Sequence, residues 1–544
     1  MKTKSFLIIV LITFCFSCKT IYSHNPIINP TTILQKNDSI DLKNWHFKDI
    51  ILDTLPGISL NRAYDSILIN KKGKEITVAV IDSEIDLSHE DLVNHIWENI
   101  DEISNNQIDD DKNGYIDDLH GWNFLGNKYN ENTEFVNLEE TRLLRKYKNY
   151  FKDNNISRLY QKDSLAYIDY INVETEFNNL VQYYNSKRKL HFVNDSLFPL
   201  STQRVSSMFK GQKYDIKDID SILTTSISRD KMIDLGFMRY SLKENLTKTY
   251  FEQQLEYYDN TLDKLVNVDF NDRQIQGDDE HDLSDTDYGN NLFGNKNKLD
   301  HGTQMGGLIS NIGWKDEIKL MSLAISAYGD EHDKDIALAI RYAVDNGAKV
   351  INMSFYKERT LYPKWVLEAI NYANSKDVLI ITISGNEGFD LNETDKYPND
   401  RLQSGAEVSD NFLVVGATGK FEDQNLKPEF SSFGSRDVDL FAPGTNISTI
   451  IPDNKYEENV SGTSCAAAIT SGVAALIRSY YPDLTASQVK HILMDSGIEY
   501  TIPVATPTEE NPDKMAPFNQ LSKSGKVVNA YNALIMAERI SNGN

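Results

Sequence analysis

Short apolar runs, separated by longer segments with helical periodicity, constrain the fold of this chain more than any other feature. The runs are rich in β-branched residues, as strands buried on both faces of a sheet are. They span Ile76 to Ile81, Val350 to Phe355, Val378 to Ile383 and Phe412 to Ala417. Helical spacing is found in Asp335 to Asn346, Lys364 to Ser375 and Ser464 to Tyr480. Strands that alternate with helices predict a layered α/β fold with a mainly parallel sheet.

The pattern changes between Gly126 and Gly289 to a polar stretch rich in Tyr, Asn and Lys. Helical segments such as Leu138 to Phe151 and Ile168 to Tyr184 lie in it, and it ends in an acidic, Gly- and Asn-rich run that is typical of a loop. We interpret residues 126–289 as an inserted, largely helical subdomain. The main domain would then consist of residues 74–125 and 290–544, preceded by an N-terminal arm over residues 19–73.

The first eighteen residues have the pattern of an export signal. Lys2 and Lys4 precede an apolar run from Phe6 to Phe16, which is too short to span a bilayer comfortably. The run ends at Cys18 in a sequence that resembles the lipobox of bacterial lipoproteins. We therefore expect export to the cell envelope, removal of residues 1–18 as a signal peptide and a lipid anchor on Cys18 that holds the protein to the membrane. The alternative is an ordinary secretory signal and a secreted protein.

The net charge and the cysteine count of the chain exclude some partners and some means of stabilisation. The 544 residues carry a formal net charge of -24, which repels phosphate backbones and gives a nucleic-acid partner no electrostatic support. Of the three cysteines, only Cys465 lies beyond the signal region, so no disulfide framework is predicted. Stability must then come from a large buried core and from bound cations.

Three distant segments each place one reactive side chain at a strand end or a helix start. Asp82 follows the first apolar run, His301 opens a helix of small residues, and Ser464 opens an apolar helix. At a helix N-terminus, free backbone N–H groups face any negative charge that forms on a bound carbonyl. Each residue alone has an ordinary structural interpretation, such as a cap.

Together, the three segments resemble the subtilisin-like serine proteases (subtilases, peptidase family S8), whose triad runs Asp, His, Ser along the chain. The resemblance implies a three-layer α/β/α fold and a serine endopeptidase that acts on protein or peptide substrates. It makes Ser464 the nucleophile, His301 the general base and Asp82 the residue that orients the imidazole. It requires no cofactor for the chemistry.

The same resemblance covers the segment around Asn386, whose side chain would complete the oxyanion hole. It also implies that substrate contacts come from Ser354, Phe355, Ser384 and Gly385. Tyr356 stands where glycine is usual in relatives, so the side-chain preference of the cleft is expected to differ from theirs.

An acidic loop predicts a structural calcium ion. Oxygen-bearing side chains alternate along it, at Asp109, Asp111, Asn113 and Asp117, with Gly114 for a sharp turn. Related subtilisin-like enzymes carry such loops near this point. A solvated acidic turn is the alternative.

Other classes of protein fit less well. His89 and Glu90 lack a histidine at Val93, so the helical zinc motif fails, and Ala466 replaces the final glycine of the α/β-hydrolase elbow. The remaining rival is a non-catalytic lipoprotein that keeps the fold and binds a partner through its insertion. Lying between two triad members, the insertion is predicted to shape access to the cleft or to recruit a partner.

Overall fold

The computed structural model describes residues 42, 44–152, 164–293, 299–313, 318–402, 404–508 and 511–543. The predicted signal peptide with Cys18, and residues 19–41 and 43 of the predicted N-terminal arm, lie outside these residues. No helix in the described part of the chain combines the length and the apolar content needed to cross a membrane.

Nine strands of the described residues form one sheet, in the order β10-β13-β7-β6-β5-β4-β1-β3-β2. All neighbours in it are parallel except β10 and β13 at one edge. The strands are β1 Ile76–Asp82, β2 Gly121–Asn123, β3 Ile318–Ala324, β4 Val350–Met353, β5 Leu379–Ile383, β6 Phe412–Thr418, β7 Leu440–Pro443, β10 Ile498–Glu499 and β13 Lys526–Val527. Two small antiparallel pairs join β8 Ile447–Ile451 to β9 Lys455–Val460, and β11 Pro503–Ala505 to β12 Met515–Pro517.

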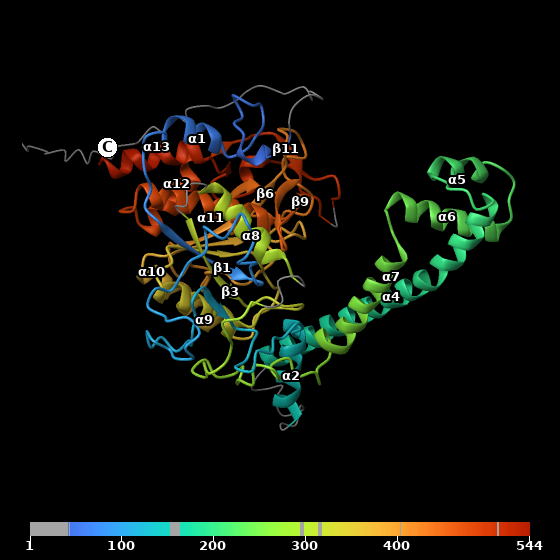
Figure 1. Cartoon of the computed structure of the whole chain (residues 1–544), viewed down its shortest axis with the longest axis horizontal. Helices are drawn as coiled ribbons and strands as arrows, with labels where there is room; N and C mark the ends of the chain where they lie inside the picture. Colours follow the sequence, from blue (N-terminus) through green and yellow to red (C-terminus); the bar gives the residue numbers. More distant parts are fainter. Residues whose placement is uncertain are drawn as a thin grey trace, which may run out of the picture.

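Helices cover both faces of this sheet, which confirms the predicted three-layer α/β/α fold (Figure 1). The core-domain helices are α1 Leu60–Ser66, α8 His301–Ile312, α9 Asp333–Asp345, α10 Pro363–Ser375, α11 Thr463–Tyr480, α12 Ala486–Ser496 and α13 Ala530–Ser541. Alternate residues of β1 enter different cores: Val78 and Val80 pack with α8 and α11, whereas Ala79 and Ile81 pack with α9 and α10. A strand buried on both faces explains its unbroken apolar run.

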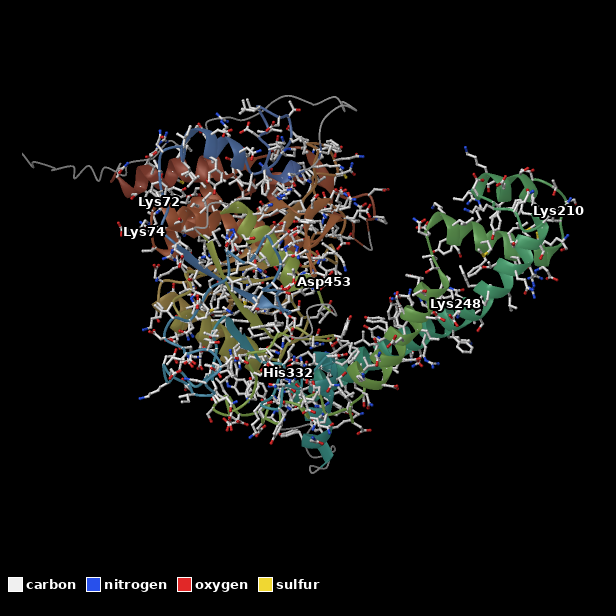
Figure 2. The ribbon with its side chains drawn as sticks, in the orientation of Figure 1. Lys72, Lys74, Lys210, Lys248, His332 and Asp453 are labelled. Carbon is white, nitrogen blue, oxygen red and sulfur yellow. The ribbon has the colours of Figure 1, made fainter. Side chains whose placement is uncertain are left out.

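The segment predicted as an insertion is helical and projects from the sheet domain as a long arm (Figure 1). Its helices are α2 Glu139–Lys152, α4 Ser164–Met208, α5 Ile216–Leu223, α6 Arg229–Lys243 and α7 Lys248–Asn260, followed by one π-helical turn, Thr261–Leu265. The two ends of the segment meet, because the N–H of Gly289 donates to the carbonyl of Gly126 at 3.0 Å. Figure 2 shows His332 where the arm joins the body, with Lys248 and Lys210 farther out along it.

Two element boundaries differ from the sequence-based expectation. The strand predicted to reach Phe355 ends at Met353, so Ser354 and Phe355 belong to the loop that leaves β4. The helix predicted from Ile168 to Tyr184 is part of the much longer α4, which continues through Pro199. Packing of α4 against α2, α6 and α7 supports this length, which local propensity does not indicate.

Candidate active site

Asp82 is the last residue of β1 and is 1% exposed. Its Oδ1 accepts hydrogen bonds from His301 Nδ1 at 2.8 Å and from the N–H of Ser83 at 2.7 Å. A buried carboxylate is costly unless donors face it. These two donors hold Asp82 in a fixed orientation, with its charge directed at the imidazole.

His301 is the first residue of α8, and close packing of this helix against the end of β1 brings it to Asp82. The N–H of Gly302 donates to Ser83 Oγ at 2.9 Å, and a Cβ atom added at Gly302 would lie 2.1 Å from the carbonyl oxygen of Ser83. Glycine is therefore required at this position. At Gly306 and Gly307 of the same helix, an added Cβ would meet side chains rather than backbone, at 3.3 Å from Leu320 and 2.4 Å from Ile450.

Opposing effects set the pKa of His301. Burial lowers it, but the charge of Asp82 and the hydrogen bond to Asp82 outweigh burial and raise the pKa above its usual value. Because Nδ1 donates to Asp82, Nε2 is the ring nitrogen that is free to accept a proton. The side chain is 38% exposed, so Nε2 remains accessible from the surface.

Ser464 is the second residue of α11 and is 8% exposed. Its Oγ donates to the carbonyl oxygen of Ser354 at 3.3 Å, and the structure contains no hydrogen bond between the described side chains of Ser464 and His301. The next residue, Cys465, is 1% exposed, and burial raises its pKa to about 12. Its thiol therefore stays neutral, and Ser464 is the more exposed of the two neighbouring side chains at this helix N-terminus.

Asn386 lies on the loop after β5, with its side chain directed at the start of α11. Its Oδ1 accepts hydrogen bonds from the N–H of Thr463 at 2.9 Å and from Thr463 Oγ1 at 3.0 Å. A backbone N–H can only donate, so the oxygen end of the amide must face Thr463. Nδ2 points elsewhere and has no hydrogen-bond partner in the described residues, so it is available to a ligand at the start of the helix.

The other residues predicted to contact substrate have mostly inward side chains. Phe355 is 8% exposed and packs in the core beside α9 and α10, and Ser384 is fully buried and donates to the carbonyl of Ser432 at 2.8 Å. Gly385 has a φ of +100°, which favours glycine. Ser354 offers its carbonyl to Ser464. Any substrate contact from Phe355 or Ser384 would therefore come from the backbone.

Tyr356, which the sequence predicted to alter the side-chain preference of the cleft, lies in the loop after β4 beside Lys396. Lys396 Nζ lies 3.9 Å from the centre of its ring and pairs with Glu387 at 3.2 Å and with Glu358 at 3.3 Å. A Cβ atom added at Gly385 would lie 3.3 Å from the Tyr356 ring. The ring therefore fills space beside the loop that carries Asn386, and glycine at position 385 makes room for it.

The acidic loop brings together a set of carboxylates that differs from the predicted one. Oxygen atoms of Glu102, Asp109 and Asp111 lie within 4.8 Å of one another. Asn113 donates to Asp111 and to Asp118, whereas the oxygens of Asp117 accept from backbone N–H groups of the same loop. The structure thus adds Glu102, seven residues before the motif, and leaves Asp117 in a turn-forming role.

The chemistry of this group fits a hard divalent cation. Burial raises the pKa of Glu102, and the neighbouring charges of Asp118 and Asp111 raise it further. Burial likewise raises the pKa of Asp118, to which Asp111 also contributes. Crowded carboxylates of this kind are stabilised by an ion with oxygen ligands such as Ca²⁺.

The sequence of this chain is similar to those of known proteins over much of its length. The model of the Subtilase family matches residues 73–520. The chain is 32% identical over 222 residues to the cell wall-associated protease of Bacillus subtilis (strain 168), covering 38% of this chain and 23% of that protein. It is 27% identical over 300 residues to the thermophilic serine proteinase of Bacillus sp. (strain AK1), covering 53% and 63%. It spans less than two thirds of the length of either relative.

Two solved structures are similar over part of the chain. A lanthipeptide protease matches with a TM-score of 0.35 and 25% identity, over 44% of this chain and 75% of that one. A cold adapted subtilisin-like serine proteinase matches with a TM-score of 0.32 and 24% identity, over 42% and 74%.

Proposed function

Because this chain belongs to the Subtilase family, we propose that it is a serine endopeptidase that hydrolyses peptide bonds of proteins through an acyl-enzyme intermediate. The single observation that carries the proposal is the 2.8 Å hydrogen bond from His301 to Asp82 at the carboxyl end of β1. Ser464, the second residue of α11, is the third member of the proposed triad. This arrangement has the order and the roles of a serine-protease triad.

The geometry supports the following chemistry. Rotation of the Ser464 side chain moves its hydroxyl from the Ser354 carbonyl toward His301, whose Nε2 takes the proton as Oγ attacks the scissile carbonyl. Asn386 Nδ2 and the backbone N–H of Ser464 donate to the oxyanion. The imidazolium, stabilised by Asp82, then protonates the leaving amine. Water, deprotonated by the same imidazole, attacks the ester, and the proton returns to Ser464 Oγ as the acid product leaves.

A covalent probe tests this proposal directly. A biotinylated fluorophosphonate is expected to label the native full-length chain and to leave Ser464→Ala unlabelled. Cleavage of a protein such as casein, lost in the same variant, would extend the result from reactivity to turnover. Absence of labelling in folded wild-type protein contradicts the proposal and favours a non-catalytic binding role.

The proposal includes a structural calcium ion held by Glu102, Asp109 and Asp111. The clustering of their oxygens within 4.8 Å and the burial of Glu102 near Asp118 support this assignment. The ion would stabilise the loop that precedes β2 and takes no part in the chemistry.

We further propose that the protein is exported and anchored to the membrane by a lipid on Cys18. The basic start and the apolar run before Cys18 in the sequence support this, although they lie outside the described residues. Metabolic labelling with an alkyne fatty acid tests the anchor, with Cys18→Ala as the control that must lose the label.

A further inference from the structure

A cavity of about 500 Å³ lies where the arm meets the sheet domain. Residues of both parts line it. The arm contributes Glu140 from α2 and Glu176 and Leu180 from α4, and the sheet domain contributes Asp330, Tyr356 and Glu358. It is the size of a site for one large side chain or a short piece of peptide.

Two loops of the sheet domain line the cavity, and each of them starts beside a residue of the proposed triad. The loop after β3 starts with Ile325 and Ser326, whose N–H groups donate to the carbonyl of Asp82 at 2.9 and 3.1 Å, and it continues to Asp330. The loop after β4 starts with Ser354, whose carbonyl accepts from Ser464 Oγ.

The loop after β4 gives the distance between the cavity and Ser464. Tyr356 comes two residues after Ser354, and Glu358 four residues after it. At about 3.4 Å per extended residue, the cavity lies roughly two to four residues from the nucleophile. A peptide whose scissile bond is at Ser464 can therefore reach the cavity without leaving the surface.

A hydrogen bond holds the arm against the first of these loops, and a buried ion pair holds it against the second. The N–H of Glu139, at the start of α2, donates to Asp330 Oδ2 at 2.7 Å. Lys357, next to Tyr356 in the chain, places Nζ 2.8 Å from Asp333 and 3.3 Å from Glu139. Because these contacts are buried, the cavity is formed before any ligand arrives.

The carboxylates that line the cavity favour a positively charged ligand. Glu176 is paired with Arg359 at 2.6 Å and Glu358 with Lys396 at 3.3 Å, but Glu140 has no ion pair within the described part of the chain. The ammonium group of Lys357 is buried in its ion pairs with Asp333 and Glu139, so it does not face the cavity. Burial and the charge of Asp330 raise the pKa of Glu140 to about 7, so a cation between these two carboxylates would relieve their repulsion.

We propose that this cavity is a substrate subsite that binds a cationic side chain, arginine or lysine, located a few residues from the scissile bond. The inference rests on the proposed function and adds a substrate class to it. Glu140 and Asp330 would face the cation, while Leu180 and Tyr356 would pack against its aliphatic stem. The arm would then determine specificity by supplying half of the subsite.

Peptide binding to the full-length Ser464→Ala protein tests the subsite without turnover. Fluorescent octapeptides carry one arginine, moved through each position in turn, and each has a partner peptide with citrulline, which has nearly the same shape but no charge. We expect arginine to bind about tenfold tighter than citrulline at one or two adjacent positions. Glu140→Gln and Asn179→Lys, added separately to Ser464→Ala, should both remove most of this difference.

Glu252→Gln, an exposed carboxylate of α7 outside the cavity, is the matched control and should preserve the difference. Asn179 is exposed on the cavity wall, so its substitution leaves the packing intact and keeps the test sound if Glu140→Gln fails to fold. Equal binding of arginine and citrulline at every position, or no binding of any peptide, overturns the inference. Fluorophosphonate labelling of the wild type reports separately on the proposed function, so a failure of one can be told from a failure of the other.

Discussion

The backbone N–H of Thr463 donates a hydrogen bond to Asn386 Oδ1 at 2.9 Å. The first N–H groups of a helix have no acceptor within it, so α11 needs such an outside partner. By supplying the oxygen, Asn386 caps the helix that carries Ser464 and at the same time turns Nδ2 outward. In the proposed mechanism, one amide thus serves both the stability of the helix start and the stabilisation of an oxyanion.

These two roles can be separated by substitution. Asn386→Ala should lower kcat for peptide hydrolysis about 100- to 1,000-fold with little change in KM, because an oxyanion donor is lost. Asn386→Asp keeps an oxygen for Thr463 but has no amide donor, so it should retain the thermal stability of the wild type while losing kcat to a similar extent. Full activity in the Asp variant would show that Nδ2 does not contact the oxyanion.

The pH dependence of the reaction should report the raised pKa of His301. Only the neutral imidazole accepts the serine proton, so kcat/KM should fall as the pH drops, with a midpoint above the usual value of about 6.5. Asp82→Asn removes the charge that raises this pKa, so the midpoint should move to lower pH and kcat should fall about 10,000-fold. Rate profiles measured for both proteins check this, and an unchanged midpoint would contradict it.

Gly302→Ala tests the close approach of α8 to the end of β1. The added Cβ would collide with the Ser83 carbonyl and push His301 away from Asp82, so fluorophosphonate labelling should slow by at least about tenfold and the Tm should fall. Gly236→Ala in α6 is the control. Nothing lies within 4 Å of its added Cβ, and this substitution should raise helix stability by about 0.5–1 kcal/mol without affecting labelling.

Arg142 should be important for attachment of the arm. It is 2% exposed, donates from Nε to Glu139 at 2.7 Å and donates to the carbonyl oxygens of Asp330 and Glu331. Arg142→Met strands buried acceptors and should cost about 3–5 kcal/mol, seen as faster hydrogen exchange in α2 and in the loop after β3.

Arg188→Met is the matched substitution at an exposed pair, Arg188 with Asp259, which should cost no more than about 1 kcal/mol. Similar exchange rates in the two variants would argue against a buried anchor at Arg142.

Calcium should stabilise the protein through the acidic loop. Addition of Ca²⁺ at 100 times its dissociation constant is expected to increase the free energy of unfolding by about 2.7 kcal/mol, and chelation should reverse the gain. Asp111→Asn should remove most of the effect, whereas Asp230→Asn, on the exposed surface of α6, should leave it intact. A Tm that does not respond to calcium in the wild type would speak for a solvated turn.

Most of the strands that the sequence predicted have an uninterrupted run of at least four apolar residues. β5 and β6 lie in the middle of the sheet, and their runs are apolar because helices cover both faces. β3 also lies inside the sheet, but Lys319 and Ser322 interrupt its apolar run. β2 has three residues and carries no periodicity to detect. Strand recognition therefore depended mainly on an uninterrupted apolar run in the sequence, because β3 is buried as completely as β1 and was still not predicted.

At the candidate site, the sequence predicted residues that lie within a recognisable motif and missed those that folding brings in from elsewhere in the chain. Asp82, His301 and Ser464 were predicted because each lies in a recognisable segment, and the structure brings Asp82 and His301 together at the carboxyl end of β1. Glu102 was missed because a turn, rather than the alternation within the loop, brings it to Asp109. The cavity beside Tyr356 was missed because its two halves come from segments about two hundred residues apart.

The hydrogen bond between Gly126 and Gly289 shows that the inserted segment leaves and rejoins the sheet domain at neighbouring positions. A segment that enters and leaves through neighbouring residues places almost no demand on the length of what lies between them. The outer helices can therefore be lengthened, shortened or replaced while the sheet domain with Asp82, His301 and Ser464 keeps its structure.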